Sequence, residues 1–427
     1  MKDECSRVEA FWQLKKEIRG SKDYLIVGID VGKNKHSAFM GTTTGKTLLK
    51  GLRVENSESG FEHLLAHVQF YQGRDGFNRV VFGVEPTSVY HKPLAEFLIE
   101  HDFMVVYVTN EAITKNRALL DGRWDKNDDK DAANVADLIS QGKCQYYDLP
   151  DIDLRDVRGL LSLRRRLKRQ EHGTRIRIRN NLVAQYFPEL DKLWNQSQPE
   201  SLAIVRWCLA PEKLCRLAFE DFFQMVTTRY RGNKQYQRLM KIWSMAPYSI
   251  GCKSGKALDV EARILVEGLK QVQKQIREVD KTIENICASF ADYELLLSIP
   301  GFGPYISAVV LAAIGNPRRF RNVSQVKRLA GLDLSASRSG NTSRTAVPIL
   351  SKKGKAELRY AVYQAAMIAS TANTLFMFYY QKLLKGRERE KGIRTKMRVK
   401  LAAKLLIIAW TLMKKKEPFD PGYLKIE

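Results

Sequence analysis

Two apolar runs of strand type in this chain end in a carboxylate, and a third acidic motif follows them in a helical pattern. Asp30 lies at the end of the first run and Glu85 at the end of the second, where a buried strand meets solvent. In the third motif, residues 126–132, Asp128 and Asp131 are three residues apart and therefore share one helix face. The fold must accommodate acidic side chains at two strand ends and on one helix.

Gathered carboxylates repel one another unless cations neutralise them, so these motifs predict a site for Mg²⁺ or Mn²⁺. Mg²⁺ takes hard oxygen ligands and commonly acts together with phosphate groups. Two such ions can stabilise the attacking and leaving oxygens of a phosphodiester. Each carboxylate alone has an ordinary explanation as a turn residue, a strand end or a partner of the helix dipole. Their joint occurrence favours the metal site, and whether Asp125 or Asp129 also takes part stays open.

The carboxylates fall within a segment, residues 23–149, that is predicted to be an α/β domain. The expected strands are residues 24–31, 36–41, 46–54, 79–84 and 103–109. The expected helices are residues 62–71, 90–101, 111–120 and 128–141. Three meandering strands followed by alternating helices and strands indicate a mixed sheet with helices on its faces.

The charge balance predicts a polyanionic partner. Lys and Arg number 71 against 47 Asp and Glu, which gives a net charge of +24. Because the cations are clustered, nucleic acid is favoured over a generally basic solubilising surface. No two of the six cysteines form a C-x-x-C pair, so we expect reduced thiols and a cytoplasmic, nucleoid-associated protein. The longest apolar run, residues 401–413, is too short for a bilayer, and no membrane partner is expected.

A basic helix and a heptad helix are predicted in the middle of the chain. Residues 154–187 have helical spacing, and their basic side chains are candidate nucleic-acid contacts, with helix packing or solubility as the alternative. These candidates are Arg164, Arg165, Arg166, Lys168 and Arg169. An a/d pattern over residues 258–286 indicates a coiled coil with the basic helix, with another subunit, or with both. Residues 188–255 contain no motif that we can interpret.

The remaining residues, from about 293 onwards, are predicted to form a mainly helical domain. Gly301 and Gly303 lie in a turn that enters an apolar helix, residues 306–314, and exposed N–H groups there suit a phosphate. A plain interhelical turn is the alternative. Tyr305, which follows this turn, is more simply a packing residue than a nucleophile.

Together these motifs resemble an RNase H-like nuclease domain of the RuvC type, and more closely the DEDD transposases of bacterial insertion sequences, insertion sequence family 110. The family's G-x-D-x-x-K, E-x-T-G-x-Y and K-T-D-x-x-D-A motifs correspond to residues 28–33, 85–90 and 126–132. Ser88 replaces the usual glycine and Asn127 the usual threonine. In the second half, the family has an I-P-G-x-G turn, a G-L-x-P-x-x-x-x-S-G-type segment and a K-x-G-x-x-x-L-R motif. These correspond to residues 299–303, 331–340 and 353–359, with Leu334 in place of the frequent proline.

The resemblance implies roles for individual residues. Asp30, Glu85, Asp128 and Asp131 would be catalytic metal ligands, and Ser339 would be the nucleophile. Further candidate nucleic-acid contacts are Gly301, Gly303, Arg338, Lys353 and Arg359. Without the resemblance, Ser339 is a solvated serine of a Ser- and Gly-rich loop. The weaker candidates for the nucleophile are Ser335, Ser337 and Ser343.

The resemblance also implies an architecture and partners. A RuvC-like domain would occupy residues 1–150, the basic helix and coiled coil residues 151–290, and a mainly α-helical transposase domain residues 291–427. The partners would be donor and target DNA, an element-encoded guide (bridge) RNA, and further copies of the chain in a dimer or tetramer with composite sites. The alternatives are a metal-dependent resolvase or nuclease in which water attacks, and a non-catalytic nucleic-acid-binding protein with a relict nuclease fold.

Overall fold

The chain folds into two compact units. The computed structural model describes residues 4–86, 88–120, 128–194, 198–335 and 349–423. The first unit comprises Met1–Ile152, Ile314–Ala356 and Leu406–Lys415. The second comprises Asp153–Ala313, Glu357–Leu405 and Lys416–Glu427. The sequence-based division into three domains stays a prediction, because compactness groups distant segments of the chain.

The first unit is built on a six-stranded mixed sheet, as the sequence predicted. Its strands are β1 (Tyr24–Asp30), β2 (Lys35–Thr42), β3 (Thr47–Glu55), β4 (Arg79–Val84), β5 (Met104–Tyr107) and β6 (Gln145–Tyr146). The strand order is β3-β2-β1-β4-β5-β6. β1 pairs antiparallel with β2 and parallel with β4, β4 pairs parallel with β5, and β5 pairs antiparallel with β6. The two-residue β6 was not predicted, because so short a strand has no pattern of its own.

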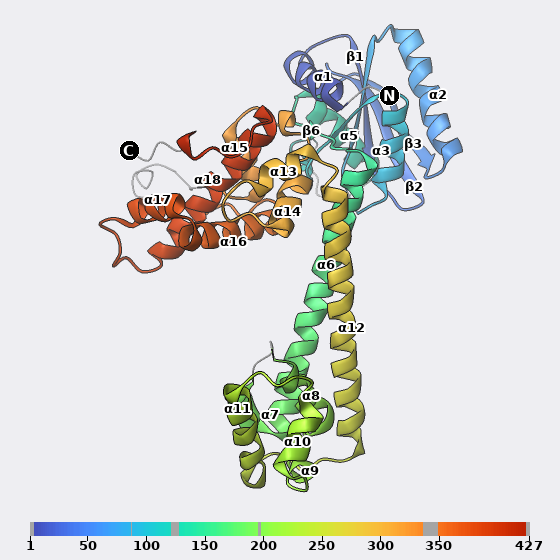
Figure 1. The fold of residues 1–427 in the computed structure, drawn as a ribbon. Coiled ribbons are helices and arrows are strands. Elements are labelled where there is room, and N and C mark those ends of the chain that lie inside the picture. The colour runs from blue at the N-terminus through green and yellow to red at the C-terminus, as the bar shows by residue number, and fades with distance from the viewer. Residues whose placement is uncertain (1–3, 87, 121–127, 195–197, 336–348, 424–427) are drawn as a thin grey trace. The chain divides into compact units, whose positions relative to one another are not determined.

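Helices cover both faces of this sheet (Figure 1). They are α1 (Glu4–Glu17), α2 (Glu58–Asp75), α3 (His91–Glu100), α4 (Asn110–Leu120) and α5 (Asp128–Ser140). The buried residues of α2 and α3 join one core cluster, with alternate residues of β1 and β4. Those of α1, α4 and α5 join the other cluster, on the opposite face. The helix α1 was not predicted, although Val8, Phe11 and Leu14 form its buried stripe.

Two glycines let α5 lie against the sheet at backbone distance. Gly28 of β1 and Gly83 of β4 are register partners on neighbouring parallel strands. A Cβ atom at Gly28 would overlap the carbonyl oxygen of Ala132 and would lie 2.7 Å from the nitrogen of Ala136. A Cβ atom at Gly83 would overlap the side chain of Ile139. The two glycines therefore form a side-chain-free strip on which the α5 backbone packs.

We predict that Gly28→Ala destabilises the protein by at least about 2 kcal/mol, because the added methyl group meets backbone atoms that cannot rotate away. Gly159→Ala is the matched control. Gly159 lies inside a helix with open space around its Cβ position, so alanine should stabilise that helix by about 0.5–1 kcal/mol. Thermal unfolding followed by circular dichroism measures both changes. A Gly28→Ala protein that melts at the wild-type temperature would contradict the close approach of α5.

A further part of the first unit comes from the second half of the chain. It contains η4 (Pro317–Arg319), α15 (Val323–Ala330), β7 (Leu334–Ser335) and β8 (Ile349–Leu350). Arg319 forms an ion pair of 2.8 Å with Asp148 in which both side chains are largely buried. The guanidinium carbon of Arg321 lies 4.0 Å from the ring centroid of Trp12. Contacts of this kind attach the β7–β8 pair to the sheet unit.

The second unit is helical. Its helices in chain order are α6 (Ile152–Arg177), η1 (Ile178–Val183), α7 (Ala184–Tyr186), η2 (Pro188–Leu193), α8 (Pro199–Trp207), α9 (Pro211–Leu214), α10 (Phe219–Val226), α11 (Asn233–Met245), η3 (Ala246–Tyr248), α12 (Lys256–Cys287), α13 (Ala291–Leu297), α14 (Pro304–Ile314), α16 (Ala356–Ala372), α17 (Thr374–Leu384), α18 (Ile393–Lys415) and η6 (Pro421–Tyr423). The last ten residues of α18 belong to the first unit. Within the part of the chain that the structure describes, no helix is both long and apolar enough to cross a membrane.

The helices α6 and α12 lie side by side (Figure 1). Arg164 forms an ion pair with Asp280, and Gln273 donates a hydrogen bond of 3.3 Å to Glu171, so the two helices run antiparallel. The long amphipathic helix is confirmed, and most of its predicted a/d stripe is buried. Near its ends Val266 and Cys287 are buried in place of Leu265 and Ile286. A straight helix of 3.6 residues per turn drifts in this way from a strict heptad, and the coiled coil stays a prediction.

Residues 188–255, which the sequence left uninterpreted, form a small cluster of helices with its own apolar core. Phe187, Phe222, Leu239 and Ile242 are fully buried in this core, together with residues from the start of α12. Figure 1 shows α8, α9, α10 and α11 gathered at one end of the α6–α12 pair. The segment is therefore a folded subdomain rather than a linker.

Candidate active site

Asp30 and Glu85 lie next to each other at the carboxyl ends of two neighbouring parallel strands. Ile29 and Val84 are register partners, and each carboxylate is the next residue along its strand. Because side chains alternate along a strand, Asp30 shares a face with Gly28, and Glu85 continues the face of Gly83. This is the face on which α5 packs. Both carboxylates therefore lie on the α5 side of the sheet edge.

The helix α5 contributes Asp131 to the same face. Asp131 is 1% exposed, and it precedes Ala132, whose carbonyl oxygen lies against Gly28. Asp128 is the first residue of α5, and its side chain lies outside the described residues. Three of the four predicted carboxylates are thus placed on one side of one sheet, by two strand ends and one helix.

Asp131 is held by a guanidinium. Its Oδ1 accepts a hydrogen bond of 2.8 Å from Nε of Arg117 and lies 2.6 Å from Nη2 of the same residue. Because Asp131 is buried, Arg117 supplies the positive charge that a buried carboxylate needs. Sequence reasoning missed Arg117, since a single arginine on a helical pattern gives no signal of its own.

A buried amide network fixes α4, which carries Arg117, against α5. Asn116 Nδ2 donates to Asn134 Oδ1 at 2.8 Å and to Asp137 Oδ2 at 2.7 Å. Asn134 in turn donates to the carbonyl oxygen of Ile113 at 2.8 Å. Hydrogen bonds of this kind hold the two helices in one register, which positions Arg117 over Asp131.

Asp129 has a different environment from Asp131. Its Oδ1 accepts a hydrogen bond of 2.6 Å from Ser37 of β2 and lies 3.4 Å from Nη2 of Arg53 of β3. The carboxylate therefore ties α5 to the strands on the far side of β1. Asp125, the other open candidate, lies outside the described residues.

The donor chemistry of the site suits a hard divalent cation. Asp30, Glu85 and Asp131 offer only carboxylate oxygens, the ligands that Mg²⁺ and Mn²⁺ prefer. Among the residues that the structure describes, no group of three or more His, Cys, Asp or Glu side chains is gathered closely enough to hold a metal.

The loop after Glu85 has a left-handed residue where the family motif has glycine. Ser88 has a φ of +58°, a conformation that L-residues with a side chain adopt at a cost. The structure therefore explains why glycine is usual at this position, and it shows that the serine adopts the backbone that the glycine would. The neighbouring Thr87 lies outside the described residues.

The serine segment, residues 336–348, is the part of the chain that connects β7 to β8. Leu334 is the register partner of Leu350, and Ser335 is the partner of Ile349. Residues 336–348, with the predicted Arg338 and Ser339 and the weaker candidates Ser337 and Ser343, lie outside the described residues. The side chain of Ser335 does as well. The base of the segment belongs to the same compact unit as the carboxylates.

Lys353, a predicted nucleic-acid contact, lies just after β8 and pairs with α4. Its Nζ lies 2.9 Å from Oε1 of Glu111, which also pairs with Lys115. These hydrogen bonds, with Lys353 as the largest contributor, lower the pKa of Glu111. The helix α4 thus contacts Lys353, just after β8, through Glu111, and it contacts Asp131 through Arg117.

The predicted basic helix α6 contains two kinds of cation. Arg164 is largely buried between Asp280 and Tyr305, and its guanidinium carbon lies 3.9 Å from the tyrosine ring centroid. Arg165 lies 3.5 Å from a carboxylate oxygen of Glu357. Arg165, Arg166, Lys168 and Arg169 are all exposed. Lys168 pairs with Glu171 one turn away, so of the five predicted contacts Arg166 and Arg169 are the two for which no ion pair occurs among the described residues.

The predicted glycine turn has a packing role. Gly301 has a φ of +91°, and a Cβ there would lie 2.6 Å from the carbonyl oxygen of Ala365 on α16. Gly303 has open space around it. Burial, reinforced by the Glu357 carboxylate, raises the pKa of Tyr305 to about 12, which leaves little tyrosinate for nucleophilic attack at neutral pH. Arg359 lies on α16 and is partly buried.

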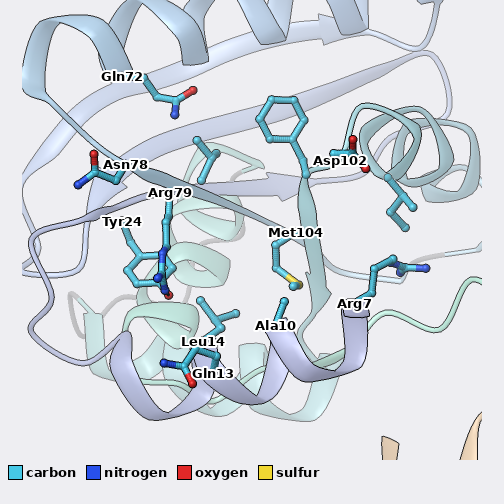
Figure 2. Close-up of a pocket in the computed structure, with 13 residues that line it drawn as sticks. Arg7, Ala10, Gln13, Leu14, Tyr24, Gln72, Asn78, Arg79, Asp102 and Met104 are labelled. Carbon is cyan, nitrogen blue, oxygen red and sulfur yellow. The ribbon is translucent and has the colours of Figure 1, made fainter. Parts of the chain in front are cut away.

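A cavity of about 420 Å³ lies at the opposite end of the sheet (Figure 2). It is lined by α1 and by the first residues of β1, β4 and β5, whereas Asp30 and Glu85 end their strands. Figure 2 shows Arg79 beside Tyr24, and Arg79 donates to Glu17 at 2.6 Å and to the Tyr24 hydroxyl at 2.8 Å. The predicted site residues do not line this cavity.

Comparisons with known proteins agree in both halves of the chain. Residues 27–188 match a family model of DEDD type described as "Transposase", and residues 293–381 match the "Transposase IS116/IS110/IS902 family". The chain is 23% identical to "Insertion element IS110 uncharacterized 43.6 kDa protein" of Streptomyces coelicolor, over 91% of this chain and 94% of that protein. It is 22% identical to "Insertion element IS116 uncharacterized 44.8 kDa protein" of Streptomyces clavuligerus, over 94% and 97%. A "Pilin gene-inverting protein" of Moraxella bovis is 30% identical, over 30% of this chain and 38% of that protein.

Proposed function

Because this chain belongs to the IS110-family transposases, and is therefore a DNA transposase, we propose that it exchanges strands between a donor and a target DNA through a covalent serine intermediate. Its catalytic residues would be Asp30, Glu85, Asp128, Asp131 and Ser339. The observation that carries the proposal is the adjacency of Asp30 and Glu85 at two parallel strand ends, with Asp131 on the helix packed over them. The similarity to a gene-inverting protein agrees with a reaction that rejoins DNA.

The DEDD domain implies dependence on a divalent metal, and we propose Mg²⁺, or Mn²⁺ in its place. The residues that would hold it are Asp30, Glu85, Asp128 and Asp131, and the ion would stabilise the charge that develops on the phosphate. Both contacts of Arg117 are with Oδ1 of Asp131, so the ion would bind Oδ2 or share Oδ1 with the guanidinium.

Ser339 supplies the chemical step that distinguishes a recombinase from a nuclease. Its hydroxyl oxygen forms a bond to phosphorus while the bond from phosphorus to the leaving oxygen of the strand breaks, and the serine proton passes to that oxygen, which becomes a hydroxyl. A hydroxyl of the partner DNA then attacks the same phosphorus, the bond to the serine oxygen breaks, and the proton of the attacking hydroxyl passes to the serine oxygen. The number of phosphodiester bonds is conserved, so no external energy source is needed. Attack by water would instead leave a broken strand.

A guide (bridge) RNA and further copies of the chain complete the proposal. The chain carries a net charge of +24, and α6 exposes Arg166 and Arg169. Such cations bind phosphates whatever the base sequence, so target choice would come from pairing between RNA and DNA. A dimer or tetramer would bring donor and target to composite sites.

The carboxylate prediction uses Asp129 as a matched control. Asp131→Asn, Asp30→Asn and Glu85→Gln should each abolish strand exchange, because each keeps the side-chain shape and removes the charge that the cation needs. Asp129→Asn should retain it, since Asp129 binds Ser37 and Arg53 instead. Recombination between matched DNA substrates, with and without RNA transcribed from the DNA that flanks the gene, measures the effect. An active Asp131→Asn protein would remove Asp131 from the site.

The serine prediction is a covalent adduct. Wild-type protein that is denatured during a reaction with labelled DNA should retain label on Ser339, as located by peptide mass. Ser339→Ala should lose both the adduct and recombination while it binds nucleic acid normally. An adduct at Ser335, Ser337 or Ser343 would move the nucleophile, and an active Ser339→Ala protein without an adduct would favour attack by water.

The basic-helix prediction separates exposed from buried arginines. Arg166→Gln combined with Arg169→Gln should weaken DNA binding and reduce its log–log salt slope by about 0.9 for each lost phosphate contact. Arg164→Gln should instead lower the melting temperature and leave the slope unchanged, because Arg164 is packed between Asp280 and Tyr305. Titration of labelled duplex DNA at several salt concentrations measures the slopes. Identical slopes for wild type and the double variant would assign these arginines to solubility.

A further inference from the structure

The loop between α10 and α11, residues 227–232, is braced from inside the protein by one buried side chain. Gln235 is 8% exposed, and its amide spans the loop. Its Oε1 accepts a hydrogen bond of 2.7 Å from the backbone nitrogen of Arg231, and its Nε2 donates to the carbonyl oxygen of Arg229 at 3.1 Å. The 227–232 loop is therefore held in one conformation before any ligand binds.

A buried ion pair fixes Gln235 in turn. Nε2 of Gln235 donates to Oε1 of Glu200 at 2.6 Å, and Oε2 of Glu200 lies 3.2 Å from Nη2 of Arg238. The Glu200 and Arg238 side chains are 4% and 14% exposed. Buried polar groups whose partners are satisfied in this way rigidify the structure around them. The support of the 227–232 loop thus extends through α8 and α11 into the core of the subdomain.

The 227–232 loop contains an exposed tyrosine that lies between two exposed arginines in the sequence. Arg229, Tyr230 and Arg231 are all exposed, and Tyr230 is 60% exposed. Neither arginine has an ion pair within the residues that the structure describes. The next exposed cation, Lys234, lies in the first turn of α11. No acidic residue occurs from position 227 to position 241.

The Tyr230 ring is continuous with an aromatic surface. Its centroid lies 6.3 Å from that of Phe223, which lies 5.6 Å from that of Tyr236. Tyr236 is 37% exposed and contacts Phe219 edge to face at 5.0 Å. Burial would be expected for an aromatic group with only a packing role, whereas Tyr230 and Tyr236 leave ring surface uncovered.

We propose that the 227–232 loop is a binding site for an unpaired nucleotide, in which Tyr230 stacks on the base while Arg229 and Arg231 contact the phosphates on either side. Stacking on an aromatic ring needs a base whose face is free, so the ligand class is single-stranded nucleic acid or an unpaired loop. A phosphate lies on either side of each nucleotide in a strand, and an arginine lies on either side of Tyr230 in the chain. The site goes beyond the strand-exchange proposal and does not depend on Ser339 or on the carboxylates.

A photo-crosslinking experiment on the full chain locates the site directly. The probes are a single-stranded oligouridylate with one 4-thiouridine and an oligothymidylate of equal length with one 4-thiothymidine. The crosslinked residue is identified by peptide mass. We expect a crosslink on Tyr230 or its neighbours in the 227–232 loop. A crosslink with the RNA probe alone assigns the site to RNA, and one with both probes assigns it to any single strand. Crosslinks confined to α6 or other segments would overturn the proposal.

Affinity measurements use an exposed tyrosine of the same subdomain as the control. Tyr230→Ala should weaken binding of the oligouridylate or oligothymidylate about 5- to 100-fold, and Tyr230→Phe should bind like wild type, because the ring is kept. Tyr248→Ala should have no effect, since Tyr248 is 83% exposed but lies outside the aromatic surface. Equal effects of the Tyr230→Ala and Tyr248→Ala changes would overturn the proposal. So would a Tyr230→Ala protein that binds normally but loses self-association.

Charge removal tests the phosphate contacts separately. Arg229→Gln combined with Arg231→Gln should reduce the log–log salt slope for the single-stranded probe by about 0.7 for each contact. Both substitutions keep the backbone groups that Gln235 binds, so the melting temperature should not change. Ser339→Ala and Asp30→Asn should bind these probes like wild type, so failure of the strand-exchange mechanism is distinguishable from failure of this site. An unchanged slope would overturn the phosphate contacts.

Discussion

The packing of α5 on Gly28 and Gly83 is the contact on which the carboxylate site depends. Glycine weakens a strand by roughly 0.5–1 kcal/mol relative to alanine, because it has more conformational freedom to lose and no side chain to pack. Here the loss is offset by helix residues such as Val135 and Ile139, which fill the space above the strands. The close approach brings Asp131 over the strand ends that carry Asp30 and Glu85. A larger residue at either glycine would lift the helix and separate the carboxylates.

The electrostatics of the site follow from the same packing. A helix that lies on the sheet buries Asp131, and an isolated buried carboxylate is strongly disfavoured. Arg117 satisfies the charge, and the amide network of Asn116 and Asn134 holds the arginine in place. The helix α4 also pairs with Lys353, just after β8, through Glu111.

The sequence predicted the elements that have a strong pattern of their own. The five longer strands follow apolar runs, and the helix α12 follows its heptad stripe, so both were found. The helix α1 was missed because Lys15 and Lys16 interrupt its short apolar stripe, and β6 because two residues show no alternation. The strand pattern also placed Asp30 and Glu85 at strand ends. Their adjacency required the parallel register of β1 and β4, which no local pattern specifies.

Long-range contacts decide which charged residues are free to bind a ligand. Local sequence patterns do not predict such contacts. The sequence gives no reason to distinguish Arg164 from Arg166. In the structure, however, Arg164 forms an ion pair with Asp280, 116 residues away, and its side chain is packed between helices. Long-range contacts also assemble the sheet unit that carries the carboxylates. Arg319 pairs with Asp148, and Trp410 donates to the carbonyl oxygen of Pro317, so segments far along the chain join the sheet unit. Residues 314–356, which include the motif at residues 331–340, therefore belong to the unit of the carboxylates through tertiary contacts, whereas the glycine turn at residues 299–303 belongs to the helical unit.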